Sequence, residues 1–405
     1  FFFQAEDGIR DSVAYRGLGD VYKRQGYDCK RGWLHELTRS DNLLEQYKLT
    51  DKQAELINGD ALRIVVSNIF EKLGVQEYDA LLGADVLVLS DLRGVDSHGV
   101  SNMLKHYVTG FRDGSINPRP DWKVIRETPS TANIDSDRGL GSIITPKAMD
   151  IAIDKAKAVG VGMVTVGNGR HLGMAAYHAM RALPHDMIGV CMTSTPVAVL
   201  PTFGAEPRLG TNPIAVAVPA NRELPFVFDA ATSSVASNKI EFAHRLGINI
   251  PGGWVAAQDG EPIMEPIPSP TDVLGSGYSL LPLGGDRELG SHKGYGLGCF
   301  VDIMAGLLTG FGYGAKPGAP NFGHFVAAYS IDAFTDIGKF KDEMDEWSRM
   351  MQSTKPATGY ERVYVPGQPE AEMEIERREF GIPLHSSVVK WIRDISEELS
   401  VDCPF

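Results

Sequence analysis

Apolar residues recur every three to four positions along three stretches near the start of the chain, which is the spacing of a helix with one buried face. The stretches are 61–73, 78–90 and 100–111. The sequence therefore predicts three amphipathic helices in an N-terminal helical part, residues 26–120. The proline-rich break at 117–120 predicts a domain boundary at its end.

Beyond this break, short apolar runs alternate with helical stretches, a pattern typical of an α/β domain. Strands are predicted at 162–166, 188–193, 214–218 and 226–228. Helices are predicted at 147–159, 174–183 and 234–245. We expect the first of these helices to open at Pro146, because proline suits the first turn of a helix. Residues 121–330 are assigned to this domain.

The rest of the chain returns to helices after a loop-rich segment. Residues 250–290 are rich in Gly and Pro and predict a long excursion, which a glycine-studded helix follows at 294–308. In the C-terminal part, 331–405, one apolar stripe runs from Phe334 to Trp347 and another covers 388–395. We expect this C-terminal helical part to pack against the N-terminal part.

Composition narrows the class of protein. The chain has 405 residues, 43% of them hydrophobic, which suffices for a large core, and its net charge of −13 opposes binding to nucleic-acid phosphates. Its four cysteines are far apart, so we expect no disulfide framework and no zinc knuckle, and a cytoplasmic location. No apolar run approaches the roughly 20 residues of a membrane helix. Residues 1–25 look like a foreign leader and are set aside, and 26–52 stay open.

His171 gives the first chemical signal. The usual phosphate-loop, dinucleotide, zinc-protease and serine-hydrolase signatures are absent from the sequence. His171 lies in a loop with three glycines between a predicted strand and a predicted helix. Glycines let the backbone approach a ligand, and the positive end of the helix favours a neutral imidazole that can act as a base. A histidine that only caps the helix is the alternative, and the local sequence leaves both interpretations open.

Three other positions also allow two interpretations. His98, in a polar turn, is either a ligand contact or part of the turn. Lys293 stands at the start of a predicted helix, where the helix dipole repels a cation, and a bound pyrophosphate would remove that conflict. Asp229 follows a strand and is either a helix N-cap or a ligand contact at the sheet edge.

Taken in order, six segments resemble the malate/L-lactate dehydrogenases of the second type, a family that includes ureidoglycolate and sulfolactate dehydrogenases and piperideine-2-carboxylate reductase. The segments are 92–99, 169–173, 203–204 with 210–213, 228–232, 292–297 and 365–368. Each is weak alone, and their order makes the resemblance specific. It implies a non-Rossmann NAD(P)-binding α/β fold, a helical domain formed by both chain ends, and a homodimer.

The resemblance also implies roles for individual residues. His171 would accept the proton during oxidation of the C2 hydroxyl of a small 2-hydroxy acid and return it in the reverse reaction. NAD, or NADP in its place, would take the hydride, and no metal is needed. Ser97 and His98 match substrate-side positions. The positions that match cofactor contacts are Thr195, Asp229, Ala230, Ala231, Lys293, Gly294, Gly367 and Gln368.

Two departures from the family leave the substrate open. Carboxylate-binding members commonly carry an arginine where this chain has Asn102, and another where it has Pro320. A guanidinium is the natural bidentate partner of a carboxylate, so we expect either another anchor or another substrate. The candidate anchors are His98, Arg93 and Arg170.

Because the substrate is left open, two alternative functions remain. One is a reductase of cyclic-imine 2-carboxylates on the same fold. The other is a nucleotide-binding protein without turnover, and the presence of both His171 and Lys293 speaks against it.

Overall fold

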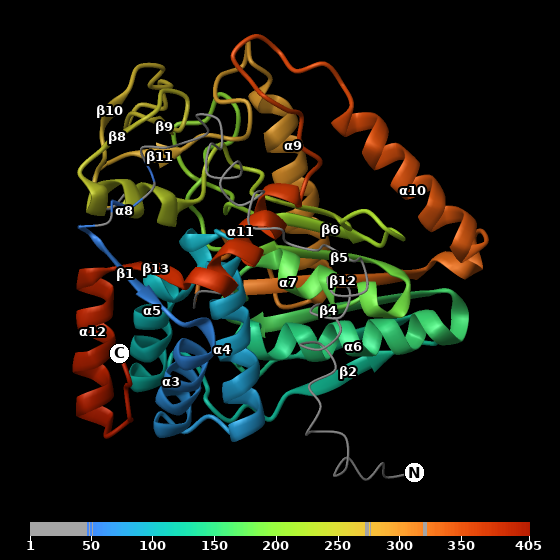
Figure 1. Ribbon diagram of the computed structural model, residues 1–405, viewed down its shortest axis with the longest axis horizontal. Coiled ribbons are helices and arrows are strands. Elements are labelled where there is room, and N and C mark those ends of the chain that lie inside the picture. The colour runs from blue at the N-terminus through green and yellow to red at the C-terminus, as the bar shows by residue number, and fades with distance from the viewer. Residues whose placement is uncertain (1–46, 48, 51, 272–274, 276, 319–321) are drawn as a thin grey trace.

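The computed structural model describes residues 47, 49–50, 52–271, 275, 277–318 and 322–405. The predicted leader, most of 26–52 and Pro320 lie outside the described residues. Figure 1 shows a sheet with helices on it, a bundle of helices beside one end of the sheet, and a loop-rich excursion above that bundle. Both chain ends of the described part contribute to the bundle.

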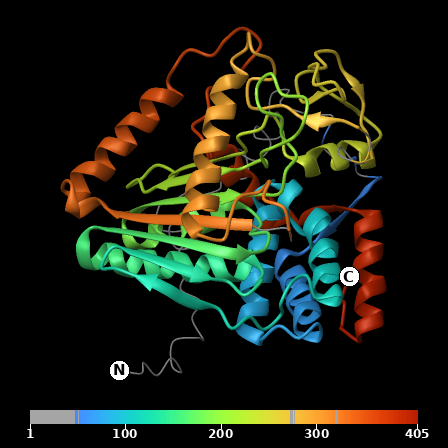
Figure 2. The ribbon, with the colours of Figure 1, turned by 180° about the vertical axis from the view of Figure 1, so that it is seen from behind.

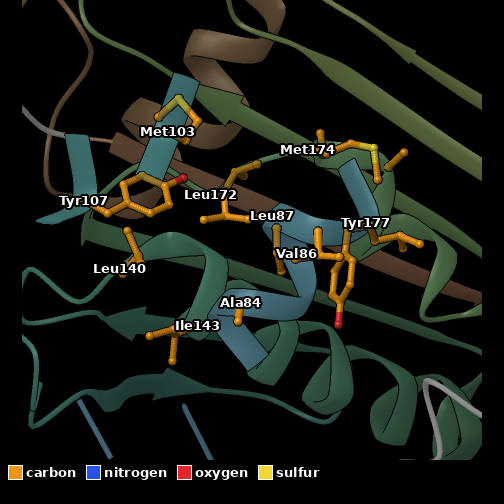
Figure 3. Close-up of a cluster of buried hydrophobic side chains, with 14 of the residues drawn as sticks. Ala84, Val86, Leu87, Met103, Tyr107, Leu140, Ile143, Leu172, Met174 and Tyr177 are labelled. Carbon is orange, nitrogen blue, oxygen red and sulfur yellow. The ribbon is translucent and has the colours of Figure 1, made fainter. Parts of the chain in front are cut away.

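The N-terminal helices form where the apolar stripes predict them. They are α3 (Gly59–Lys72), α4 (Glu77–Leu92) and α5 (Val100–Asp113). Asn58 caps α3, because its side chain accepts the backbone N–H groups of Asp60 and Ala61. The stripes meet in one core, and Figure 3 shows Val86 and Leu87 there beside Tyr107. Burying each large apolar side chain contributes roughly 1.5–3 kcal/mol.

A seven-stranded sheet of order β2-β3-β4-β12-β5-β6-β7 forms the α/β part. Its strands are β2 (Lys123–Glu127), β3 (Thr131–Asp135), β4 (Val161–Gly169), β5 (Met187–Ser194), β6 (Ile214–Val218), β7 (Phe226–Ala230) and β12 (Phe322–Ser330). β3 and β4 run parallel, and the other neighbouring strands run antiparallel. The strand β12 is central, because it pairs with both β4 and β5.

Helices cover both faces of this sheet, as Figures 1 and 2 show. On one face lie α6 (Gly141–Val159) and α7 (Ala175–Met180). On the other lies α9 (Ser291–Val301), which continues as a π-helical turn at Asp302–Gly306. The helix begins three residues before the predicted start, and the rest of the predicted range up to residue 308 consists of π- and 3₁₀-helical turns that continue α9. Turns of π-helix are rare and occur often near functional sites.

Two sequence-based expectations are wrong. The helix α6 begins at Gly141, so Pro146 lies inside it and does not open it. Residues 141–145 are all buried, and their packing outweighs the hydrogen bond that proline cannot donate. Phe334 lies outside α10 (Ile337–Gln352) and is 72% exposed, so it does not belong to the buried stripe.

Several elements had no counterpart in the prediction. They are the central strand β12, the strands β2 and β3, and the helix α11 (Gln368–Phe380). The excursion carries two short ladders, β8 (Asn249–Ile250) with β10 (Ile267–Pro268) and β9 (Val255–Ala256) with β11 (Ser279–Leu280). Pairs of two residues are too short to leave a periodic pattern in the sequence.

The two ends of the described chain meet in the helical bundle. β1 (Ala54–Ile57) pairs antiparallel with β13 (Ile382–His385), and α12 (Ser386–Leu399) packs on α3. By contrast, α10 lies at the far side of the sheet, where Trp347 contacts Phe226 edge to face. The domain boundaries at 25, 120 and 330 stay a prediction. Among the described helices, none is both long and apolar enough to cross a membrane.

Candidate active site

His171 lies in the loop that connects β4 to α7. This loop is held from the centre of the sheet by His324 of β12, which is fully buried. Nε2 of His324 lies 3.0 Å from the carbonyl oxygen of Arg170, and its Nδ1 lies 2.8 Å from Oγ1 of Thr193 on β5. Burial lowers the pKa of His324 to about 4, so it is a neutral structural group. The sequence did not single out His324, because its role depends on burial between two strands.

Two polar contacts fix the ring of His171. The hydroxyl of Tyr107 on α5 lies 2.7 Å from Nδ1, and the backbone N–H of Gly173 donates to the same atom over 3.1 Å. The ring of His98 stacks on His171 with centroids 5.6 Å apart, and Phe322 contacts it edge to face. Both contacts to nitrogen use Nδ1, and Nε2 has no hydrogen bond within the described part of the chain.

The imidazole of His171 is neutral near pH 7. Burial lowers its pKa well below 6.5, and the neighbouring imidazole of His98 lowers it further. The N–H of Gly173 also turns its positive end toward Nδ1, which disfavours the imidazolium form. With its hydrogen on Nδ1 and donated to the hydroxyl of Tyr107, the neutral ring presents the lone pair of Nε2, as a general base requires. With Nδ1 accepting the N–H of Gly173, the ring hydrogen lies on Nε2, which can then only donate.

The turn that carries Ser97 and His98 is a short 3₁₀ helix at Asp96–His98. Oγ of Ser97 lies 2.9 Å from Nδ1 of His98, and burial lowers the pKa of His98 to about 4. Arg377 of α11 binds the side chain of Asp96 at 2.5 Å and also the backbone oxygen of Asp91. The turn is therefore tied to α11, from the other end of the chain.

Two of the candidate arginine anchors are bound to other partners within the fold. Arg93 pairs with Glu374 at 2.9 Å, and both side chains are almost fully buried. Arg170 donates to the backbone oxygens of Ser115 at 2.6 Å and Gly169 at 2.7 Å. These guanidinium groups therefore serve the fold. The position of Pro320 lies outside the described residues.

Asp229 lies on β7 and contacts the start of α7, the helix that follows the loop of His171. Its Oδ2 accepts the backbone N–H of Ala176, in the first turn of α7, over 2.6 Å. The interpretation of Asp229 as the N-cap of the helix that follows it in the chain is therefore wrong. Its carboxylate instead caps α7, which precedes it in the sequence. Desolvation raises the pKa of Asp229, the hydrogen bond from Ala176 lowers it, and the charge of Glu370 raises it, with a net value of about 7.

Lys293 is exposed in the first turn of α9, as the sequence predicted. The next residue, Gly294, packs against the 229–232 segment through Leu283. A Cβ at Gly294 would lie 2.4 Å from the backbone N and O of Leu283, and Leu283 donates its N–H to Thr232 over 2.9 Å. Ala230 and Ala231 lie between Asp229 and this contact.

Gly367 brings the start of α11 to the same strand. It adopts φ = +91°, and a Cβ there would lie 2.8 Å from Cβ of Val227 on β7. The side chain of Gln368 turns back to Val365 and Glu372, so it stabilises the start of α11 itself. Thr195 follows β5 directly, and its backbone N–H donates to Oδ1 of Asn212 over 3.0 Å.

The candidate residues thus gather in two adjoining groups. The first contains Ser97, His98 and His171, and the second contains Asp229 with the starts of α9 and α11. The hydrogen bond between Asp229 and Ala176 links them. Thr195 is joined to α9 through Asn212, whose Nδ2 donates to the carbonyl oxygen of Gly298. Tyr107 and His324 are the residues of the site that sequence reasoning missed.

The chain is similar to known dehydrogenases over most of its length. The family profile described as malate/L-lactate dehydrogenase matches residues 57–393. The malate dehydrogenase of Pyrococcus abyssi is 40% identical over 357 residues, 87% of this chain and 97% of that protein. The L-sulfolactate dehydrogenase of Methanocaldococcus jannaschii is 36% identical and is aligned over 84% of this chain and 95% of its own length.

Solved structures agree in fold. The crystal structure of malate dehydrogenase from Entamoeba histolytica superposes with a TM-score of 0.83 at 34% sequence identity, covering 87% of this chain and all of that one. The predicted mixed α/β class is confirmed by this similarity.

Proposed function

Because the chain belongs to the malate/L-lactate dehydrogenase family and is a dehydrogenase acting on CH–OH groups, we propose that it oxidises the C2 hydroxyl of a small 2-hydroxy acid with NAD or NADP. The same site would reduce the matching 2-keto acid. The observation that carries this proposal is the neutral His171, fixed at Nδ1 by Tyr107 and Gly173 at the junction of the two groups of site residues.

The second group has features that fit a dinucleotide. The helices α9 and α11 both begin without a side-chain cap from the described residues, so each presents backbone N–H groups that suit a pyrophosphate. Lys293 adds a positive charge beside one of them. Oε2 of Glu370 is buried without a hydrogen-bond partner among the described residues, next to Asp229. A carboxylate pair of this kind suits ribose hydroxyls and would repel a 2′-phosphate, which favours NAD.

The residues proposed to hold the cofactor are those of the second group with Thr195. When bound, the nicotinamide would accept the hydride from C2 of the substrate. Asp229 would then keep the two groups in register through its bond to Ala176.

His171 handles the proton in this proposal. The substrate hydroxyl passes its proton to Nε2 of His171 when the neutral ring carries its hydrogen on Nδ1 and donates it to the hydroxyl of Tyr107, because only then does Nε2 hold a free lone pair. The hydroxyl of Tyr107 can donate or accept, so it keeps its contact with Nδ1 in either tautomer. The low pKa of His171 then favours release of the proton before the next turnover.

The test is a spectrophotometric assay at the reduced-nicotinamide band with a panel of 2-hydroxy acids, 2-keto acids and a cyclic-imine 2-carboxylate. We expect turnover of at least one hydroxy acid, and a His171→Ala variant without turnover that binds the cofactor as the unmodified protein does. His185→Asn is the matched control, because His185 is exposed at the end of a 3₁₀ turn. Turnover of the imine alone would refute the hydroxy-acid assignment. Full activity of His171→Ala would remove His171 from the mechanism.

We also propose that the protein is a homodimer and that α9 takes part in its interface. Four apolar side chains at helical spacing are between 43% and 52% exposed along α9 and the turns after it: Leu297, Phe300, Ile303 and Leu307. Figure 2 shows α9 at the front of the molecule, over the sheet. A second copy would remove this apolar face from water. Mass measurement in solution, with Phe300→Glu as the disrupting variant, tests the proposal.

A further inference from the structure

The loop backbone is held on both sides of His171 by buried imidazoles. Nε2 of His324 lies 3.0 Å from the carbonyl oxygen of Arg170. Nε2 of His178, on α7, lies 2.9 Å from the carbonyl oxygen of Leu172. Both imidazole side chains are fully buried. The backbone that carries His171 is therefore clamped from β12 on one side and from α7 on the other.

His178 has one protonation state near neutral pH. A carbonyl oxygen can only accept, so Nε2 of His178 carries the ring hydrogen and donates it to Leu172. Nδ1 of His178 is buried without a partner among the described residues, and an imidazolium would place a second hydrogen there with no acceptor. Burial lowers the pKa of His178 to about 3, so the ring is neutral. The donor to Leu172 is therefore present throughout the neutral pH range.

This donor reaches His171 through one peptide group. The carbonyl of Leu172 and the N–H of Gly173 belong to the same planar trans peptide, so they point in opposite directions. With its oxygen held by His178, the peptide directs its N–H at Nδ1 of His171, 3.1 Å away. Gly173 adopts φ = +78°, and a Cβ there would lie 2.6 Å from Cγ1 of Val86, so this side of the peptide has little room to rotate.

The direction of this N–H decides where His171 keeps its ring hydrogen. An N–H donor stabilises Nδ1 as an acceptor, which leaves the ring hydrogen on Nε2. The hydroxyl of Tyr107 can donate or accept, so its 2.7 Å contact with Nδ1 suits either tautomer. The peptide that His178 holds therefore supplies the preference.

We propose that His178 sets the tautomer of His171 through the peptide of Leu172 and Gly173, so that the resting site presents Nε2–H to the substrate. This inference rests on the proposed function. A keto oxygen can only accept a hydrogen bond, so it binds this tautomer, whereas a hydroxyl can bind either one. The resting site is therefore preorganised for the 2-keto acid, and oxidation of the 2-hydroxy acid begins with a shift of the ring hydrogen to Nδ1, next to Tyr107. His178 is a positioning residue, because it acts only through His171.

The ring hydrogen of His171 can be located by nuclear magnetic resonance of the protein with nitrogen-15-labelled histidine. We expect it on Nε2 in the unmodified protein, and a His171→Ala variant identifies the signal by its loss. His178→Leu removes the donor, so the tautomer ratio should move toward Nδ1 by about 3- to 10-fold, the value of one neutral hydrogen bond. His178→Gln should restore the ratio, because its amide nitrogen donates from nearly the position of Nε2.

His244→Leu is the matched control, on α8 (Ser237–Leu246). Nδ1 of His244 also lies 3.0 Å from a backbone oxygen, that of Ser269, but the residue is exposed and outside the loop of His171. This variant should leave the tautomer unchanged. If His178→Leu does not fold, His178→Met removes the same donor with a side chain that adapts to irregular space. A hydrogen on Nδ1 in the unmodified protein, or an unchanged ratio in the folded apolar variant, would overturn the proposal.

Substrate affinity gives a second readout, which a purely structural role would not move in this way. The KM for the 2-keto acid should rise about 3- to 10-fold in His178→Leu, because the donor at Nε2 is less populated. The KM for the 2-hydroxy acid should change less than about twofold, because a hydroxyl suits both tautomers. Equal rises for both acids would contradict the inference.

The proposed function and the role of His178 can fail separately. If the tautomer shifts as expected but no acid is turned over, the proposed activity fails and the role of His178 stands. If the acids are turned over and the tautomer does not shift in His178→Leu, the activity stands and the role of His178 fails.

Discussion

The hydroxyl of Tyr107 can be removed without disturbing the packing around it. Its ring is fully buried in the helical core, 6.4 Å from the ring of Phe70, and Figure 3 shows it beside Leu172 in the loop of His171. Its hydroxyl makes the 2.7 Å contact with Nδ1 of His171. The change Tyr107→Phe keeps the ring volume and deletes this contact alone, whereas Tyr107→Ala would leave a cavity costing about 3–5 kcal/mol.

The size of the effect depends on the hydrogen bond that Nδ1 of His171 keeps in the Tyr107→Phe variant. A neutral hydrogen bond contributes about 0.5–1.5 kcal/mol net, and a buried group left without any partner costs about 1–3 kcal/mol. Nδ1 retains the N–H of Gly173 at 3.1 Å, so we expect a loss near the middle of these ranges, about 1–2 kcal/mol. With a tenfold change in rate for every 1.36 kcal/mol, kcat should fall about 5- to 30-fold.

Steady-state kinetics with fluorescence titration of the cofactor measures this prediction. The dissociation constant of the cofactor should not change, because Tyr107 contacts the base and lies outside the group around Asp229. Tyr177→Phe is the matched control: its hydroxyl donates to Asp85 over 2.8 Å, in the same core. That variant should lose stability without loss of kcat. An unchanged kcat in Tyr107→Phe, or equal losses in both variants, would refute the role given to Tyr107.

Three further predictions concern charge. Lys293→Gln should weaken cofactor binding about 3- to 30-fold with little change in kcat, as isothermal titration can show; equal affinity would remove Lys293 from the cofactor site. Desolvation raises the pKa of Asp229 from 3.8 to about 7, so ionisation destabilises the fold as pH rises through that interval. Asp229→Asn should therefore become more stable relative to the unmodified protein as the pH rises from 5 to 8, as urea titrations can measure. A difference in the free energy of unfolding that does not change with pH would contradict this. Because burial lowers the pKa of His171, kcat/KM for oxidation should stay flat down to below pH 6.5, and a fall centred above 6.5 would disprove it.

The apolar pattern in the sequence located the helices of the N-terminal part. In α3 and α5, one face of each helix is buried, so the period of 3.6 residues is written into the sequence. The ends of α3, α4 and α5 agree with the prediction within two residues, although α4 is buried on all sides from Val86 to Leu92. The same pattern could not find β12, because a strand buried on both faces has no alternation to detect. It also misplaced the start of α6, where tertiary packing overrides the preference of Pro146.

For the candidate site, the sequence by itself determined which residue types stand at the chain's turns: a histidine between a strand and a helix, a lysine at a helix start, an aspartate at a strand end. It also carried the ordered motifs that led to the family. Only the tertiary structure decided what each of these residues touches. Tyr107 and His171 are 64 positions apart, and Arg245 reaches Asn102 across 143 positions. Contacts of that kind depend on how whole elements pack, and no local period or propensity encodes which faces will meet.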